Sequence, residues 1–133
     1  MKRLGISIYP EHASLKSNKE YIDLASRCGF LRIFTCLLSV NKPKEEIKAE
    51  FKELIDHAHQ NDMEVILDVA PYVFDRLDIA YDDLSFFEGI NADGIRLDEG
   101  FDGHREYRKL QTESRLFAHM PQLLSSALFG LIV

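Results

Sequence analysis

Apolar residues along the chain gather in four short runs separated by longer, mixed segments. The runs cover positions 3–9, 31–37, 64–70 and 94–98, so their starts lie roughly 30 residues apart. That spacing fits one strand followed by one crossover helix. The four units share little sequence identity, so the repeat is one of architecture.

The segments between the runs carry helical patterns. In the first, Ser17 and Glu20 have the spacing of a capping box. An apolar face then continues to Cys28, and Gly29 suits the left-handed position after a helix. In the second, Pro43 fits a first helical turn, and apolar residues follow at helical spacing up to position 58. The third segment is less regular and predicts two short helices, at 71–77 and 82–88.

Strands that alternate with helices predict a parallel sheet with right-handed crossovers. An open doubly wound sheet and a closed barrel both satisfy this pattern. The chain has no GxGxxG motif after the first run and no P-loop, which are signatures of nucleotide-binding open sheets, and this favours the barrel. A complete (β/α)8 barrel takes about 250 residues, whereas this chain has 133. The fold class predicted is therefore α/β, the N-terminal half of a TIM barrel with about four parallel strands.

The charge and composition of the chain bear on which kinds of partner it binds and where it is located. The net charge is −6 and no basic patch stands out, so binding to nucleic acid is disfavoured. The apolar stretch at 123–133 has 11 residues, and a membrane span needs about 20. The first residues lack the features of a signal peptide, so we expect a cytoplasmic location. No disulfide framework or metal-binding spacing is present, so no metal or cofactor is predicted.

Polar residues occur where the predicted strands end. In parallel α/β enzymes the chemistry lies at the carboxyl ends of the strands. Each run here ends in a polar residue or leads into one. The candidates, in chain order, are Tyr9, Glu11, His12, Thr35, Asp68, Arg96 and Asp98.

The third and fourth runs contain charged residues, which are unusual in strands that are otherwise apolar. Arg96 and Asp98 are two positions apart and share a strand face, where charges are costly without a partner or a ligand. They form either a structural ion pair or a ligand-facing pair. Asp68, in an otherwise apolar strand, either bonds a neighbouring loop or acts on substrate. Paired carboxylates suit glycoside hydrolysis as well as metal-dependent isomerases and aldolases, so the residues alone leave the reaction open.

Four segments together resemble the bacterial 6-phospho-N-acetylmuramidase family, formerly a domain of unknown function sometimes labelled outer surface protein. They are GISIYPEH at 5–12, FTCLLS at 34–39, ILDVAP at 66–71 and DGIRLDEGF at 93–101. The resemblance covers roughly residues 3–103. It implies a TIM barrel followed by a smaller cyclophilin-like β domain. It also implies a cytoplasmic glycosidase whose substrate is a phosphorylated amino-sugar disaccharide, cleaved between N-acetylmuramic acid 6-phosphate and N-acetylglucosamine during cell-wall recycling.

Within the matched segments, strand-end position suggests the site residues. Asp68 and Asp98 are the leading catalytic carboxylates, with Glu11 next. Arg96 would hold a substrate anion or lower the pKa of a neighbouring carboxylate. The other expected substrate contacts are Tyr9, His12 and Thr35.

After about position 103 the chain departs from the family pattern. We expect 1–103 to be a partial barrel domain and 104–133 a divergent tail, helical in part. The departure predicts a truncated or frameshifted product that is inactive as it stands, and the alternative is a genuine helix around 114–131 that covers a sheet edge. Two other functions remain open: a metal-dependent sugar-phosphate isomerase or aldolase, and a non-catalytic half-barrel that self-associates through its open sheet edges.

Overall fold

The structure is a computed structural model that describes residues 4–37, 41–80, 83–97 and 117–119. Strands and helices alternate along most of this part of the chain. The elements are β1 (Gly5–Ile8), α1 (Leu15–Arg27), β2 (Arg32–Cys36), α2 (Lys44–Gln60), β3 (Glu64–Val69), α3 (Pro71–Leu77), α4 (Ser85–Gly89), β4 (Gly94–Leu97) and β5 (Phe117–His119).

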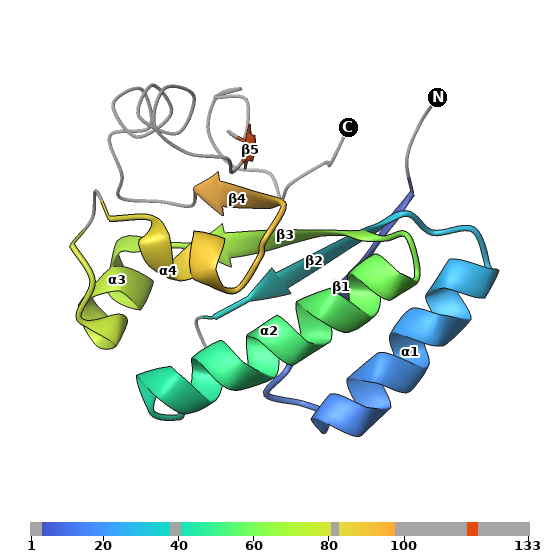
Figure 1. Ribbon diagram of the computed structural model, residues 1–133, viewed down its shortest axis with the longest axis horizontal. Coiled ribbons are helices and arrows are strands. Elements are labelled where there is room, and N and C mark those ends of the chain that lie inside the picture. Colours follow the sequence, from blue (N-terminus) through green and yellow to red (C-terminus); the bar gives the residue numbers. More distant parts are fainter. Residues whose placement is uncertain (1–3, 38–40, 81–82, 98–116, 120–133) are drawn as a thin grey trace, which may run out of the picture.

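All strands belong to one parallel sheet whose spatial order, β1-β2-β3-β4-β5, follows the chain. Figure 1 shows α1 and α2 side by side against the same face of this sheet. A doubly wound sheet would reverse its strand order and carry helices on both faces. Four parallel strands joined by crossover helices, in sequential order, confirm the predicted half of a TIM barrel.

The hydrophobic core lies between the sheet and the helices. Every second strand residue points toward the helices, and apart from Thr35 these positions are apolar, from Ile6 and Ile8 to Ile95. From α2, Phe51 and Ile55 pack against them and are almost fully buried. Each such side chain stabilises the fold by about 1.5–3 kcal/mol through burial.

The other face of the strands, here called the inner face, is more polar. Strand register aligns its residues in rows across neighbouring strands. In a complete barrel this face lines the interior. In β1 to β4, the described residues of the inner face are Gly5, Ser7, Arg32, Phe34, Cys36, Glu64, Ile66, Asp68, Gly94 and Arg96.

The start of α1 differs from the sequence prediction. The N-cap is Ser14, whose side chain accepts a hydrogen bond from the Ser17 amide at 3.2 Å. The capping box predicted at Ser17 and Glu20 is wrong, because Ser14 supplies the cap one turn earlier. At the other end Cys28 is exposed rather than part of the apolar face. Gly29 has φ of +85°, which confirms its left-handed position.

The remaining helices follow the predicted pattern closely. Pro43 stands at the N-cap of α2 instead of inside its first turn. The predicted range of α3 is confirmed. The second short helix, α4, begins at Ser85 and is shorter than expected.

Three residues of the tail are described, and they form β5, parallel to β4. This strand replaces helix at 117–119, within the range where a helix was expected. Backbone pairing with the edge of β4 determines this conformation. The rest of the tail lies outside the described residues, so its expected helical content stays a prediction.

A polar clamp, formed by Asp93, His59 and the Val65 amide, ties α2 to the amino ends of β3 and β4. Asp93 Oδ2 accepts hydrogen bonds from the Val65 amide and from His59 Nε2, both at 2.7 Å. Asn91 Nδ2 lies 3.3 Å from His59 Nδ1, so a neutral ring with its proton on Nε2 satisfies both contacts. The clamp therefore fixes the helix layer to the sheet at the end opposite the carboxyl ends of the strands.

We expect Asp93→Ala to lower the free energy of unfolding by about 1–3 kcal/mol, because the Val65 amide loses its acceptor. Urea denaturation followed by circular dichroism measures this. The matched control is Asp56→Ala, which removes only an exposed pairing with Lys52 and should cost about 0.5 kcal/mol or less. Equal effects of the two substitutions would contradict a structural role for the clamp.

Candidate active site

The carboxyl ends of β3 and β4 bring two of the predicted site residues together. Asp68 and Arg96 are register partners on the inner face. Arg96 Nη2 donates a hydrogen bond to Asp68 Oδ2 at 2.5 Å, and the side chains are 31% and 16% exposed. The sequence leaves two alternatives for Arg96, a structural ion pair or a ligand-facing pair, in both cases together with Asp98. Its partner in the described residues is Asp68 on the neighbouring strand, and Asp98 lies outside them.

Phe34 on β2 completes this end of the inner face. The guanidinium carbon of Arg96 lies 5.7 Å from the centroid of the Phe34 ring, within the range of a cation–π interaction. Phe34 is itself 6% exposed. The Arg96 guanidinium is thus held by a carboxylate on one edge and by an aromatic ring on one face.

Gly5 leaves the space that the Phe34 ring occupies. A Cβ atom at Gly5 would lie 2.7 Å from Phe34 Cε2, closer than unbonded carbon atoms approach. Sequence analysis missed both residues. Strand alternation in the sequence puts Phe34 on one face with Cys36, but only the β2–β3 register shows that this face also carries Asp68.

The loop after β1 gathers three further predicted residues. Tyr9 and His12 have ring centroids 6.0 Å apart, and the His12 amide donates to the Tyr9 carbonyl at 3.0 Å. His12 Nε2 lies 3.8 Å from Glu11 Oε1. Tyr9 is 54% exposed. The loop thus places an aromatic ring, a carboxylate and an imidazole together, two strands away from Asp68 in the sheet.

Thr35 does not join either group. It pairs in register with Leu67, a core residue on the helix side, so it lies on the opposite face of the sheet from Asp68. Thr35 is 2% exposed and its hydroxyl has no hydrogen-bond partner among the described residues. Thr35 lies two residues after Ile33 and two before Leu37, both core residues, and residues two apart in a strand share a face.

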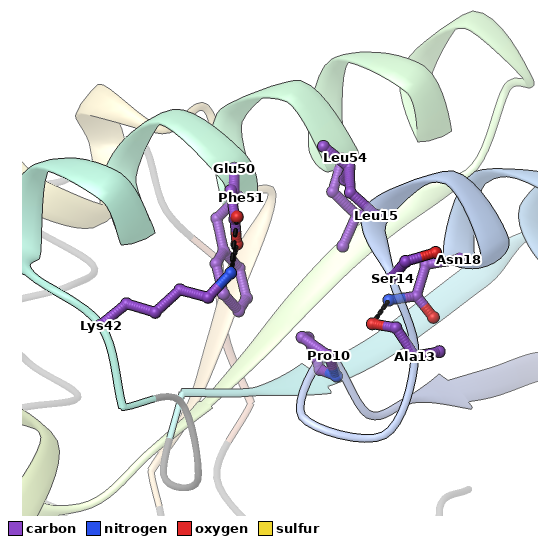
Figure 2. Close-up of a pocket in the computed structure, with 9 residues that line it drawn as sticks. All are labelled: Pro10, Ala13, Ser14, Leu15, Asn18, Lys42, Glu50, Phe51 and Leu54. Atoms are coloured by element: carbon purple, nitrogen blue, oxygen red, sulfur yellow. Dashed lines mark hydrogen bonds and ion pairs between the residues drawn. The ribbon is translucent and has the colours of Figure 1, made fainter.

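A small cavity lies on the helix side of this end of the sheet. Figure 2 shows it between the loop after β1 and α2, with Lys42 reaching Glu50. The Lys42 ammonium contacts both carboxylate oxygens of Glu50, at 2.6 and 2.8 Å, and this hydrogen bonding raises the pKa of Lys42. The cavity volume is about 60 Å³, far below the roughly 300 Å³ or more of a typical ligand pocket. It therefore suits a few water molecules and not a disaccharide.

Two searches of the described residues bear on other kinds of function. They contain no group of three or more His, Cys, Asp or Glu side chains placed to hold a metal ion. Within the same residues, no helix combines the length and apolar character of a membrane span.

Residues 4–117 match a family described as 6-phospho-N-acetylmuramidase, N-terminal. A search of curated proteins finds no match. Among solved structures, an uncharacterized protein from B. cereus is 50% identical with a TM-score of 0.71, and the alignment covers 90% of this chain and 30% of that one. The family match continues past position 103, where we expected the resemblance to end.

More distant structures share the fold alone. A conserved protein of unknown function from Enterococcus faecalis is 19% identical with a TM-score of 0.66, covering 88% of this chain and 31% of that one. A thiamine phosphate pyrophosphorylase from Pyrococcus furiosus is 17% identical with a TM-score of 0.57, covering 89% and 48%. The chain thus spans about a third to a half of the length of these structures.

Removing Arg96 should destabilise the fold, because Asp68 would lose its charged partner in a largely buried position. We expect Arg96→Ala to cost about 1–3 kcal/mol in urea denaturation. Arg27→Ala is the control, since Arg27 makes one exposed bond to a backbone carbonyl. Adding Asp68→Asn to Arg96→Ala should recover part of the loss. If the double variant is as unstable as the sum of the single ones, the two side chains are not coupled.

Proposed function

Because this chain belongs to the 6-phospho-N-acetylmuramidase N-terminal family, we propose that it forms the first part of a glycosidase barrel acting in the cytoplasm. The substrate is a phosphorylated amino-sugar disaccharide, cleaved between N-acetylmuramic acid 6-phosphate and N-acetylglucosamine. The observation that carries this proposal is the family match over 4–117. The charged residues of the chain that lie at the carboxyl ends of its strands support it.

Glycoside hydrolysis needs one protonated acid and one ionised carboxylate, with water as the second reactant. Asp68 suits the ionised role, because a guanidinium N–H binds a carboxylate most strongly when that carboxylate is charged. Glu11 and Asp98 are then the candidates for the acid. The glycosidic bond breaks, the glycosyl group passes to water and a proton goes to the leaving oxygen, so the step balances without an oxidant or a reductant.

The loop after β1 would contact the sugar. Tyr9 is half exposed and offers an aromatic face together with a hydroxyl group. His12 lies beside it and beside Glu11. A ring stacked on Tyr9 would place its hydroxyl groups within reach of His12. Thr35 is left out of this set because it faces the helix layer.

We further propose that activity belongs to a complete barrel. The chain covers 30% of the B. cereus chain, and barrel enzymes commonly bind a substrate phosphate with the loops after strands seven and eight. The groups that would recognise the 6-phosphate are therefore expected in the part of the relative that this chain does not cover.

The test is hydrolysis of a 6-phosphomuramyl disaccharide by a chimera in which this chain replaces the matching part of the B. cereus relative. We expect the chimera to be active and Asp68→Asn to lower kcat/KM at least 100-fold, the scale expected for a carboxylate in the reaction. Asp56→Asn, on the outer surface of α2, is the control and should leave kcat/KM unchanged.

Two results would contradict the proposal. An active chimera with an unimpaired Asp68→Asn variant removes Asp68 from the mechanism. Full activity of the 133-residue chain alone overturns the view that a complete barrel is needed. Liquid chromatography of the released sugars distinguishes cleavage from background hydrolysis in each case.

One observation also favours self-association of the half-barrel. Tyr21 and Leu24 on α1 are 45% and 50% exposed, and they lie on the side of the helix away from α2, which Lys19 and Asp23 contact. In the described sheet β1 is an edge strand, and α1 is the helix that follows it in the chain. A second copy of the chain could cover both.

We expect sedimentation velocity to detect a dimer of the chain that Tyr21→Lys combined with Leu24→Lys abolishes, because apolar contact area is lost. Tyr72→Lys is the matched control: Tyr72 is 58% exposed but belongs to α3. A monodisperse monomer at high concentration would rule out this mode of association.

A further inference from the structure

Most hydrogen-bonding capacity of Arg96 is unused. A guanidinium group carries five N–H donors in one plane. Among the described residues one of its nitrogens, Nη2, donates to Asp68, and the Phe34 ring lies against one face of the guanidinium. The side chain is 31% exposed. With respect to the described residues, one planar edge of Arg96 is therefore free at the carboxyl end of the inner face.

Arg32 at the other end of the inner face shows the contrast. Its Nε and Nη2 both donate to Glu64 Oε2, at 3.0 and 2.8 Å, and its side chain is 17% exposed. That edge of Arg32 is engaged in holding β2 to β3. The two arginines share a face of the sheet, but Arg96 alone combines greater exposure with a single bonded nitrogen.

The orientation of Arg96 is determined by its neighbours. Asp68 accepts a hydrogen bond from one nitrogen, and the Phe34 ring packs against one face of the guanidinium. The absence of a side chain at Gly5 lets that ring lie where it does. A guanidinium held in this way loses little further freedom when it binds a ligand, which strengthens binding.

The charge balance at Arg96 favours a singly charged ligand. Guanidinium groups bind both carboxylates and phosphates through paired N–H bonds. Asp68 already balances the charge of Arg96, so the pair has no net positive charge to offset the larger desolvation cost of a phosphate dianion. A planar monocarboxylate matches both the shape and the charge of the site.

We propose that Arg96 forms a carboxylate-binding subsite, with Phe34 and Gly5 as positioning residues. Resting on the proposed function, the ligand group is the lactyl carboxylate of N-acetylmuramic acid and not the 6-phosphate. The subsite would then distinguish muramic acid from glucosamine derivatives, since only the former carry this group.

The test uses the 133-residue chain labelled with ¹⁵N, with D-lactate and inorganic phosphate as separate probes. We expect D-lactate to produce saturable shifts of the backbone amides of Asp68 and Arg96, and phosphate to produce at least threefold smaller ones. Larger shifts with phosphate would overturn the assignment to carboxylate. No shift with either anion would overturn the subsite itself.

Two variants test the geometry without removing charge. Arg96→Lys keeps the positive charge but not the planar edge, and should reduce the D-lactate shifts at least fivefold. Phe34→Leu keeps an apolar side chain but removes the ring under Arg96, and should weaken binding of D-lactate while leaving the dispersion of the amide spectrum intact. Arg32→Lys is the matched control and should leave the D-lactate shifts unchanged. Unchanged binding in Arg96→Lys would contradict the proposal.

A further titration with two sugar phosphates tests whether the subsite binds the lactyl group of the substrate. N-acetylmuramic acid 6-phosphate should shift the Arg96 amide, and N-acetylglucosamine 6-phosphate, which lacks the carboxylate, should not. Equal shifts with both sugars would overturn the lactyl assignment. Failure of the disaccharide hydrolysis would refute the proposed function alone, because the D-lactate result does not depend on it.

Discussion

The parallel register of the strands is the constraint on which the rest of the structure depends. Because side chains alternate along a strand, one register sends Ile6, Ile33 and Val65 into the helix layer. The same register aligns Asp68 with Arg96 on the inner face. A slip of one residue would bury these charges among the helices and expose the core. The strand register therefore determines both the packing of the core and the placement of the polar groups.

The two ends of the inner face differ in how their charged groups are bonded. At the amino end, Arg32 and Glu64 are bonded to each other, and the polar clamp of Asp93, His59 and the Val65 amide joins sheet to helix nearby. These groups satisfy one another and stabilise the fold. At the carboxyl end, Arg96 lies against Phe34 and, among the residues that the structure describes, bonds through one nitrogen only. This division of stability from chemistry is the one expected of barrel enzymes.

The family match indicates the class of protein, whereas the share of the relative that is covered indicates how much of the relative's length this chain corresponds to. The match over 4–117 places the chain in the 6-phospho-N-acetylmuramidase N-terminal family, and the alignment with the 50% identical structure covers 30% of that longer chain. Catalysis in such barrels draws residues from several strands. The proposed roles of Asp68 and Glu11 are therefore parts of a site that the remaining strands would complete.

The sequence by itself determined the alternation of strands and helices, because their periods of about 2 and 3.6 residues are local properties. It also identified Asp68 and Arg96, since charges within apolar strands are rare without a purpose. Tertiary structure decided what depends on contacts between distant segments. It paired Arg96 with Asp68 on the neighbouring strand, turned Thr35 toward the helices and made room at Gly5 for Phe34. These outcomes follow from the register between strands roughly 30 residues apart, which no local pattern contains.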